Sequence, residues 1–152
     1  MDGSVTFRAI TAGDGEAVVE MMRSLYEEDA SGYVSPEHFR RTVAFLTAHP
    51  ERGRIVVFDA EGAAAIGYAI CIPYWSNEFG GSVVEVDELF VRREHRSRGI
   101  GRAFFGWVEG SRLFEAVAIE LEVTPGNARA QEFYRRMGFA ARKNVLQVKR
   151  VG

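Results

Sequence analysis

The chain has 152 residues and a formal net charge of -2. Its length suits one domain with a buried core, and 47% hydrophobic with 26% charged residues is ordinary for a soluble globular protein. The near-neutral charge excludes a general electrostatic attraction to nucleic acid. A lone cysteine, Cys71, excludes an intrachain disulfide and suits a reducing compartment.

No stretch of the sequence has the pattern of a signal peptide or a membrane span. The first ten residues contain no apolar run of the required kind. Nowhere do about 18 apolar residues follow one another. We therefore expect a cytoplasmic protein without a membrane partner.

The first third of the chain predicts one strand and two helices. Residues 5–10 have the pattern of a short strand, and apolar residues recur at helical spacing over 15–28. Ser35 and Pro36 form a typical helix start, with a hydroxyl cap before a proline at the first helical position. The second helix should therefore run over 36–49.

The rest of the chain is richer in strands. An aromatic loop is expected over 74–81, and the helix expected over 127–137 has an asparagine cap and a glycine stop. The remaining patterns predict a helix over 99–113 and strands over 55–59, 65–72, 82–91, 117–123, 139–142 and 145–149. We therefore expect one mixed α/β domain over residues 1–152, with a single central sheet of about seven strands and about four helices.

A basic, glycine-containing turn between the strand over 82–91 and the next helix suggests an anion site. Helix N-termini present unpaired N–H groups and partial positive charge. Gly99 and Gly101 lack side chains, so a pyrophosphate could approach the main chain there. The alternative is an ordinary turn with solvated arginines. The arginines concerned are Arg92, Arg93, Arg96, Arg98 and Arg102.

Two motifs resemble those of the GNAT superfamily of N-acetyltransferases. Residues 96–101, Arg-Ser-Arg-Gly-Ile-Gly, are similar to the family's R/Q-x-x-G-x-G/A signature between a strand and a helix. Residues 127–139 resemble its N-x-x-A-x-x-F-Y-x-x-x-G-F segment. The resemblance covers about 83–139 and implies an acyl-CoA N-acyltransferase fold with a mostly antiparallel sheet.

The resemblance also implies acetyl-CoA as the cofactor and a place for it. Pantetheine would insert between the strands over 83–91 and 117–123, against backbone groups of Leu89, Phe90 and Val91. The pyrophosphate would lie on the turn formed by Arg96, Ser97, Arg98, Gly99, Ile100, Gly101 and Arg102. The far side of the cofactor would be flanked by Asn127, Phe133 and Arg136.

Transfer to an amine needs a base, because an alkyl amine of pKa about 10.4 is mostly ammonium at neutral pH. Asp87 and Glu88 are the candidates, and as strand neighbours they point to opposite faces unless a bulge intervenes. Glu88 matches a position often used by bacterial relatives and is preferred, while Asp87 matches the acidic position of diamine acetyltransferase-like members. Tyr134 matches the family tyrosine that protonates the leaving thiolate. The alternative for Asp87 and Glu88 is that both are ordinary polar positions at a sheet surface. Without the resemblance, Tyr134 would be a core aromatic.

The resemblance implies that the acceptor lies against the first two helices, the loop between them and the loop before the strand over 82–91. The acidic and aromatic residues there suit a cationic amine, through charge pairing and cation–π contact. Residues 66–81 also look similar to diamine acetyltransferase-like proteins, which favours a polyamine or an aminoglycoside as the small-molecule acceptor. The acidic run over 27–29 fits a solvated helix end equally well, and the sequence does not identify the amine. The candidate acceptor residues are Tyr26, Glu28, Tyr33, Trp75 and Phe79.

Other functions stay open at this point. A protein lysine or N-terminus would need an open groove in place of a closed pocket, and a non-catalytic acyl-CoA-binding domain would bind the cofactor without turnover. Basic residues cluster only at the glycine turn, so no nucleic-acid partner is expected. The histidines have no metal-ligand spacing and Cys71 lies in an apolar strand, so neither a metal nor an acyl-enzyme is expected. Dimerisation is common among relatives, which makes a homodimer a further expectation.

Overall fold

The structure is a computed structural model that describes residues 4–29 and 32–152. The chain divides into two compact units, residues 1–121 and 122–152. In the described part of the chain, the first unit holds a five-stranded sheet with three α-helices, and the second holds one α-helix. None of the helices in the described ranges is long and apolar enough to cross a membrane.

The sheet of the first unit follows chain order, β1-β2-β3-β4-β5. Its first four strands are antiparallel neighbours, and β5 is parallel to β4. A parallel partner needs a long crossover, which here contains the helix α3 (Ile100–Gly110). The strands are β1 (Val5–Ala9), β2 (Arg54–Ala60), β3 (Ala63–Ser76), β4 (Gly81–Val91) and β5 (Ala118–Glu120).

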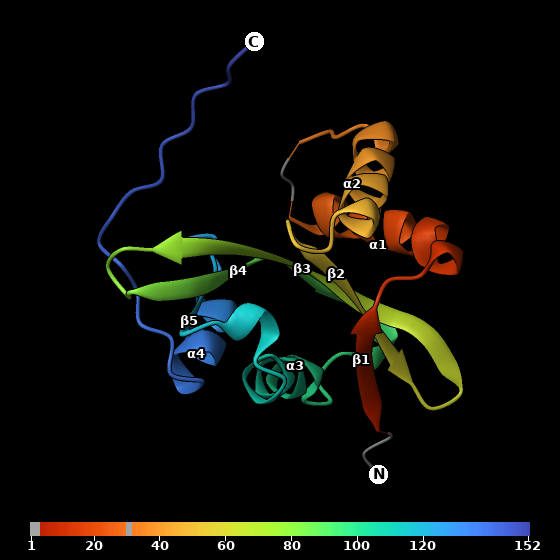
Figure 1. Ribbon diagram of the computed structural model, residues 1–152. Helices are drawn as coiled ribbons and strands as arrows, with labels where there is room; N and C mark the ends of the chain where they lie inside the picture. The colour runs from red at the N-terminus through yellow and green to blue at the C-terminus, as the bar shows by residue number, and fades with distance from the viewer. Residues whose placement is uncertain (1–3, 30–31) are drawn as a thin grey trace. The chain divides into compact units, whose positions relative to one another are not determined.

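Helices cover both faces of this sheet. The helices α1 (Gly15–Glu28) and α2 (Pro36–Ala48) lie on one face and α3 lies on the other (Figure 1). The start of α2 is as predicted, because the Ser35 hydroxyl accepts a hydrogen bond from the N–H of Glu37 and a proline follows the cap. The described residues of the unit also form three short 3₁₀ turns, η1 (Ala12–Asp14), η2 (Arg93–His95) and η3 (Leu113–Glu115).

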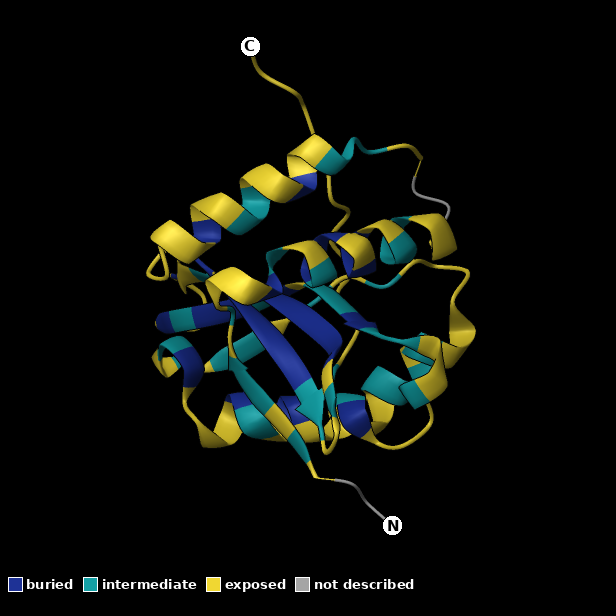
Figure 2. Ribbon diagram, turned by 90° about the vertical axis from the view of Figure 1, so that its right-hand side faces the viewer, coloured by how far each residue is buried: buried dark blue, intermediate teal, exposed yellow. Residues whose placement is uncertain are grey.

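Strand β2 is buried on both faces, and for this reason its sequence is a continuous apolar run. Ile55 and Val57 pack with buried residues of α1 and α2. On the other face, the Phe58 ring meets Phe7 edge-on and lies 5.1 Å from the ring of Phe104 in α3. Figure 2 shows the middle of the sheet in dark blue. Two apolar layers therefore fix the centre of the sheet, one under each set of helices.

The second unit contains α4 (Ala128–Arg136) and an extended C-terminal segment. The helix begins at Asn127, whose side-chain oxygen accepts a hydrogen bond from an N–H of the first turn, as the cap predicts. The ring of Tyr134 packs edge-on against those of Phe133 and Phe139. An aromatic cluster thus holds the end of α4 against the segment that follows it.

Two predicted strands are wrong. Residues 137–152, all of them described, form neither helix nor strand, so the strands expected over 139–142 and 145–149 are absent. Val145, Leu146 and Val148 are 81%, 67% and 81% exposed. Their apolar pattern is typical of a strand, but a strand also needs a hydrogen-bonded neighbour. The sheet therefore has five strands and not seven within the described residues.

The other elements lie close to prediction, with two differences near the candidate site. Strand β3 extends to Ser76, so Tyr74 and Trp75 lie on a strand and not in the loop expected over 74–81. The reason is that the β3–β4 hairpin stays paired to its tip. Strand β5 is shorter than the strand expected over 117–123. Most of β4 is consequently left with a strand neighbour on one side only.

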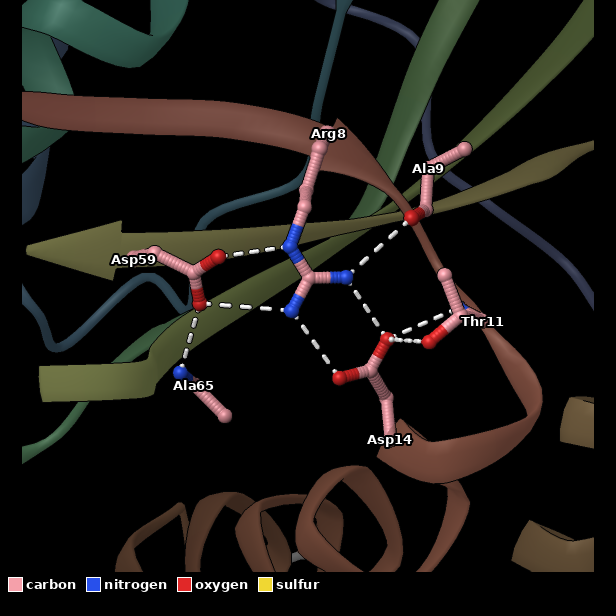
Figure 3. Close-up of polar contacts among 6 residues, drawn as sticks. All are labelled: Arg8, Ala9, Thr11, Asp14, Asp59 and Ala65. Carbon is pink, nitrogen blue, oxygen red and sulfur yellow. Dashed lines mark hydrogen bonds and ion pairs between the residues drawn. The ribbon is translucent and has the colours of Figure 1, made fainter.

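Arg8 joins three elements near the beginning of the chain (Figure 3). Its guanidinium donates to Asp59 of β2 at 2.5 Å and to the two carboxylate oxygens of Asp14 at 2.7 and 2.9 Å. Asp14 also accepts hydrogen bonds from the N–H and hydroxyl of Thr11, and Asp59 accepts one from the Ala65 N–H. The bonds from Arg8 are the main cause of lowered pKa values at Asp14 and Asp59. One charged cluster therefore holds β1, β2 and the turn before α1.

Replacing Arg8 by methionine should lower the free energy of unfolding by about 2 kcal/mol at neutral pH, because two partly buried carboxylates lose their cation. Both carboxyl pKa values are depressed in the folded state. The contribution is therefore fully present above the unfolded pKa of about 3.9, and it is lost progressively as the pH falls from there through the lower pKa values of the folded state. Urea unfolding of both proteins at neutral pH and near pH 3 measures the difference, which should shrink in acid.

Arg40→Gln is the matched control, since Arg40 pairs with Glu16 at 3.4 Å on the surface. This change should alter the free energy of unfolding by less than about 0.5 kcal/mol. Equal losses in the two variants would show that the Arg8 cluster is worth no more than a surface ion pair.

Candidate active site

A β-bulge in β4 sets the direction of the two candidate bases. Ile70 of β3 lies opposite Glu88 and Cys71 lies opposite Val86, so Asp87 is an extra residue in the ladder. A bulge of this kind interrupts the alternation of side chains along a strand. Glu88 consequently points toward α1, and Asp87 is exposed beside it.

The Glu88 carboxylate lies between α1 and the sheet and is held by two phenols. The Tyr26 hydroxyl donates to Oε2 at 2.9 Å, and the Tyr68 hydroxyl donates to Oε1 at 2.7 Å. Burial raises the pKa of Glu88, the two hydrogen bonds oppose that rise, and the charge of Asp87 adds to it. A carboxylate with a raised pKa is a stronger base than one in water, which suits proton abstraction.

The two neighbouring carboxylates differ in their surroundings. Desolvation raises the pKa of both Asp87 and Glu88. A base also needs a fixed position relative to the proton that it takes. Of the two, Glu88 is the one that hydrogen bonds hold in place, whereas Asp87 stands on the exposed side of the bulge.

Strand β4 has a strand neighbour on both sides only over its first part. Strand β5 pairs with residues 83–85 of β4, and the pairing then stops. Among the described residues, the strand partners of Leu89, Phe90 and Val91 all lie in β3. An unpaired strand edge presents N–H and C=O groups to which another extended chain can bond. Such an edge lies where the resemblance puts pantetheine.

The turn before α3 has the geometry of an anion-binding helix start. Gly99 precedes the helix with φ +74°, and Ser97 also has a positive φ of +63°. The Ala103 N–H donates to the Gly99 carbonyl at 3.0 Å, so the earlier N–H groups of the helix have no acceptor within it. Apart from Gly99 and its two chain neighbours, no described residue has an atom within 4 Å of the place that a Cβ on Gly99 would take. The turn is therefore open to a phosphate, with Arg98 and Arg102 exposed around it.

Arg96, which the resemblance puts on the pyrophosphate, is engaged within the protein. Its Nε donates to the Val91 carbonyl at 2.7 Å, and one terminal nitrogen bonds both carboxylate oxygens of Glu28 at 2.8 and 3.0 Å. Its guanidinium lies 5.3 Å from the centre of the Phe90 ring. Arg96 and Glu28, expected on the cofactor and on the acceptor, are thus paired with each other. Their ion pair joins the end of α1 to the turn after β4.

A pocket of about 320 Å³ lies beside this ion pair. It brings a predicted acceptor residue, Glu28, together with a predicted cofactor residue, Phe90. The pocket therefore opens between the last turn of α1 and the end of β4. Its other lining residues are Ser24, Glu27, Arg92, Arg93 and Glu94.

The predicted acceptor residues do not all gather at Glu88. Tyr26 contacts it directly. Trp75 lies at the hairpin end of β3, roughly 20 Å along the sheet from Glu88, and Phe79 lies in the hairpin turn. Tyr33 precedes α2 and is 88% exposed. The hairpin aromatics are therefore at the far end of β4 from the candidate base.

The remaining predicted residues lie in the second unit. Asn127 caps α4, and Arg136 forms an ion pair with Glu132 at 3.0 Å. Burial raises the pKa of Tyr134, whose ring packs against Phe133. The phenol therefore keeps its proton at neutral pH. The catalytic and cofactor roles that the resemblance implies for these residues stay predictions.

Sequence reasoning missed Tyr68. It stands in the apolar run of β3, has no exposed surface and belongs to the core between the sheet and α1. The sequence does contain a signal for Tyr68, because a tyrosine in a buried strand needs a hydrogen-bond partner for its hydroxyl. Tyr68 lies opposite Phe90, and on one face of a sheet the residue two positions away, here Glu88, is within reach.

Cys71 is buried in β3. Burial raises the pKa of its thiol to about 12, so the thiolate that a nucleophile needs is scarce at neutral pH. Among the side chains that the structure describes, no three His, Cys, Asp or Glu residues are grouped as metal ligands would be.

Comparison with known proteins identifies related sequences. The model of the acetyltransferase (GNAT) family matches residues 19–139, a range that includes both motifs. An uncharacterized N-acetyltransferase of Methanocaldococcus jannaschii is 30% identical over 143 residues, which is 92% of this chain. The chain spans 62% of the length of that relative.

Solved structures share the fold. A possible acetyltransferase from Clostridium difficile 630 has a TM-score of 0.84 at 16% identity, with 97% of this chain and 99% of the other covered. An integron cassette protein from the mobile metagenome of Cole Harbour Salt Marsh has a TM-score of 0.79 at 27% identity, with 96% and 90% covered. These two structures and this chain therefore share a similar arrangement of helices and strands, although most of their residues differ.

Proposed function

Since this chain belongs to the acetyltransferase (GNAT) family, we propose that it transfers an acetyl group from acetyl-CoA to a primary amine. The observation that carries the proposal is the Glu88 carboxylate, fixed by two tyrosines on the half of β4 that has no second strand neighbour. The open helix start at α3 follows that half directly in the chain. We also propose that residues 1–152 form one acetyltransferase domain, because the family match runs through both units.

Residues of the first unit support the proposal that acetyl-CoA is the cofactor. Backbone groups of residues 89–91 would pair with the amides of pantetheine along the open edge. The N–H groups at the start of α3 would bind the pyrophosphate, and Arg98 and Arg102 would add positive charge. When bound, acetyl-CoA supplies a thioester carbonyl that an amine can attack. On the family motif alone, we propose that the far side of the cofactor is flanked by Asn127, Phe133 and Arg136.

In this proposal Glu88 takes the proton of the amine. An ammonium cannot attack a carbonyl, so its proton must pass to a base, directly or through water. Each Glu88 oxygen keeps an acceptor site besides the one bonded to Tyr26 or Tyr68. In the same proposal, Tyr134 donates a proton to the leaving thiolate of coenzyme A. The support for this role is the family motif.

The acceptor that we propose is a small cationic amine such as a polyamine or an aminoglycoside. Burial and the negative charges of Glu88, Asp87 and Asp29 raise the pKa of the Tyr26 hydroxyl. The same charges would attract a cation, and the tyrosine ring would offer it an aromatic face. The more distant parts of a long acceptor would contact Tyr33, Trp75 and Phe79.

Two further properties are proposed from the sequence alone, a cytoplasmic location and a homodimer. The rival functions are transfer of the acetyl group to an amine of a protein, and binding of acetyl-CoA without turnover. The experiment below distinguishes both from the proposed function.

Thiol release from acetyl-CoA against a panel of amines tests the proposed function. The panel contains polyamines, aminoglycosides, amino acids and a lysine-containing peptide at mildly alkaline pH, with a no-amine control. Polyamines or aminoglycosides should give turnover above the control. Turnover with the peptide alone would favour a protein acceptor, and acetyl-CoA binding by calorimetry without turnover would favour a regulatory domain. No binding of acetyl-CoA at all would contradict the proposal.

Glu88→Gln should lower kcat/KM by about 10²–10⁴, because glutamine keeps the shape of the side chain but cannot take the proton. Asp87→Asn is the matched control one residue away, and this change should lower kcat/KM far less. Burial raises the pKa of Glu88, so the acid limb of the pH–rate profile should lie above the ordinary glutamate value of about 4.3 and disappear in Glu88→Gln. A greater loss in Asp87→Asn would transfer the role of base to Asp87.

Tyr134→Phe should reduce kcat roughly 10²-fold while the affinity for acetyl-CoA stays nearly unchanged, because the ring still packs but supplies no proton. Initial rates and calorimetry on the same preparation measure the two quantities. An unchanged kcat, under conditions in which chemistry limits the rate, would remove Tyr134 as the acid.

A further inference from the structure

Resting on the proposed transfer through Glu88, we propose that Tyr68 and Tyr26 are positioning residues whose hydroxyls hold the Glu88 carboxylate ionised and in place to take the proton of the acceptor amine. The two hydroxyls reach different oxygens of the carboxylate from two different elements, β3 and α1. One pair of contacts therefore controls both the orientation and the protonation of the same group.

Tyr68 is the buried partner. Its side chain has no exposed surface, and its ring lies 6.1 Å from the ring of Phe90 within the core. A phenylalanine would fill this space without burying a polar atom. What the hydroxyl of Tyr68 adds is therefore its hydrogen bond of 2.7 Å to Glu88 Oε1. Because the ring cannot move without repacking the core, Tyr68 fixes the position of the carboxylate.

Tyr26 is the second donor, in the last turn of α1. Its hydroxyl bonds Glu88 Oε2 at 2.9 Å, and its ring lies 5.2 Å from the ring of Phe39 in α2. With one phenol on each oxygen, each oxygen keeps a lone pair that can accept a proton. The proton leaves the amine nitrogen for a carboxylate oxygen while both phenols keep theirs, so the step needs no other reactant.

Several groups act on the protonation of Glu88. Burial, Asp87 and Asp29 at the end of α1 raise its pKa, and the hydroxyls of Tyr68 and Tyr26 lower it. Burial and the charge of Glu88 raise the pKa values of both phenols, which therefore stay protonated as donors. Removing either hydroxyl leaves the raising effects in place, so the pKa of Glu88 should then rise.

A carboxyl titration of the full chain without ligands tests the proposal. Carboxyl carbon NMR signals are followed against pH, and the Glu88 signal is assigned by its loss in Glu88→Gln. Tyr68→Phe and Tyr26→Phe remove only the hydroxyls, and each should raise the pKa of Glu88 by about 1. Tyr74→Phe is the matched control, because Tyr74 lies on the same strand and the carboxylate that acts most strongly on its hydroxyl is Glu120 and not Glu88. In that variant the pKa of Glu88 should not change.

An unchanged Glu88 pKa in both Tyr68→Phe and Tyr26→Phe would overturn the proposal, and so would an equal rise in Tyr74→Phe. Thermal unfolding of each variant checks that the fold is kept. If Tyr68→Phe does not fold, Tyr26→Phe decides the outcome, because Tyr26 is only half-buried and its loss disturbs the core less.

The same variants in the thiol-release assay separate this proposal from the proposed function. In Tyr68→Phe and Tyr26→Phe, the acid limb of the pH–rate profile should move to higher pH by the amount seen in the titration. If the pKa of Glu88 rises in these variants while the acid limb of the pH–rate profile does not move, another group is the base. That result would overturn the positioning role. No turnover with any amine would contradict the proposed function alone, because the titration needs no substrate.

Discussion

A carboxylate that is removed from water needs hydrogen-bond donors, because an unpaired buried charge costs several kcal/mol. Glu88 finds its donors in Tyr26 and Tyr68, one from a helix and one from the neighbouring strand. The contact depends on the bulge at Asp87, which turns Glu88 toward α1, and on a tyrosine within an otherwise apolar strand. The proposed base is therefore tied to the core through Tyr68, and its protonation is coupled to the packing of α1 on the sheet.

The two halves of β4 differ because β5 is short. In the first half, Val83 and Val84 are fully buried and the strand is bonded on both sides. Beyond Glu85 the bonds to β5 stop, and the bulge follows within two residues. A free edge is a hazard in an ordinary sheet, since it can pair with another chain. In this sheet the free edge is the place where we propose that pantetheine binds, so the same lack of a neighbour serves the function.

The parts of this fold that the sequence predicts are those defined by signals close to them in the chain. The hydroxyl and proline before α2, the apolar period of α1 and the asparagine before α4 each lie within a few residues of the element that they define. Features that depend on pairing across the chain are not encoded in this way. The bulge at Asp87 follows from the register with β3, and the patterns over 139–142 and 145–149 are strand-like but lack a neighbour. Within the site, the motif turns were predictable, whereas the hydroxyl partner Tyr68 required knowledge of which strands are adjacent.

The last turn of α1 connects the two parts of the site. Tyr26 bonds Glu88, and two residues later Glu28 bonds Arg96 in the turn before α3. The arginine of the glycine motif therefore supports the turn through an ion pair, and Arg98 and Arg102 are further exposed charges around that turn. Because one helix end contacts both the proposed base and the proposed phosphate turn, a shift of that end would loosen a bond to each. The proposed acceptor side and the proposed cofactor side are thus both in contact with one helix end that lies far from both motifs in the sequence.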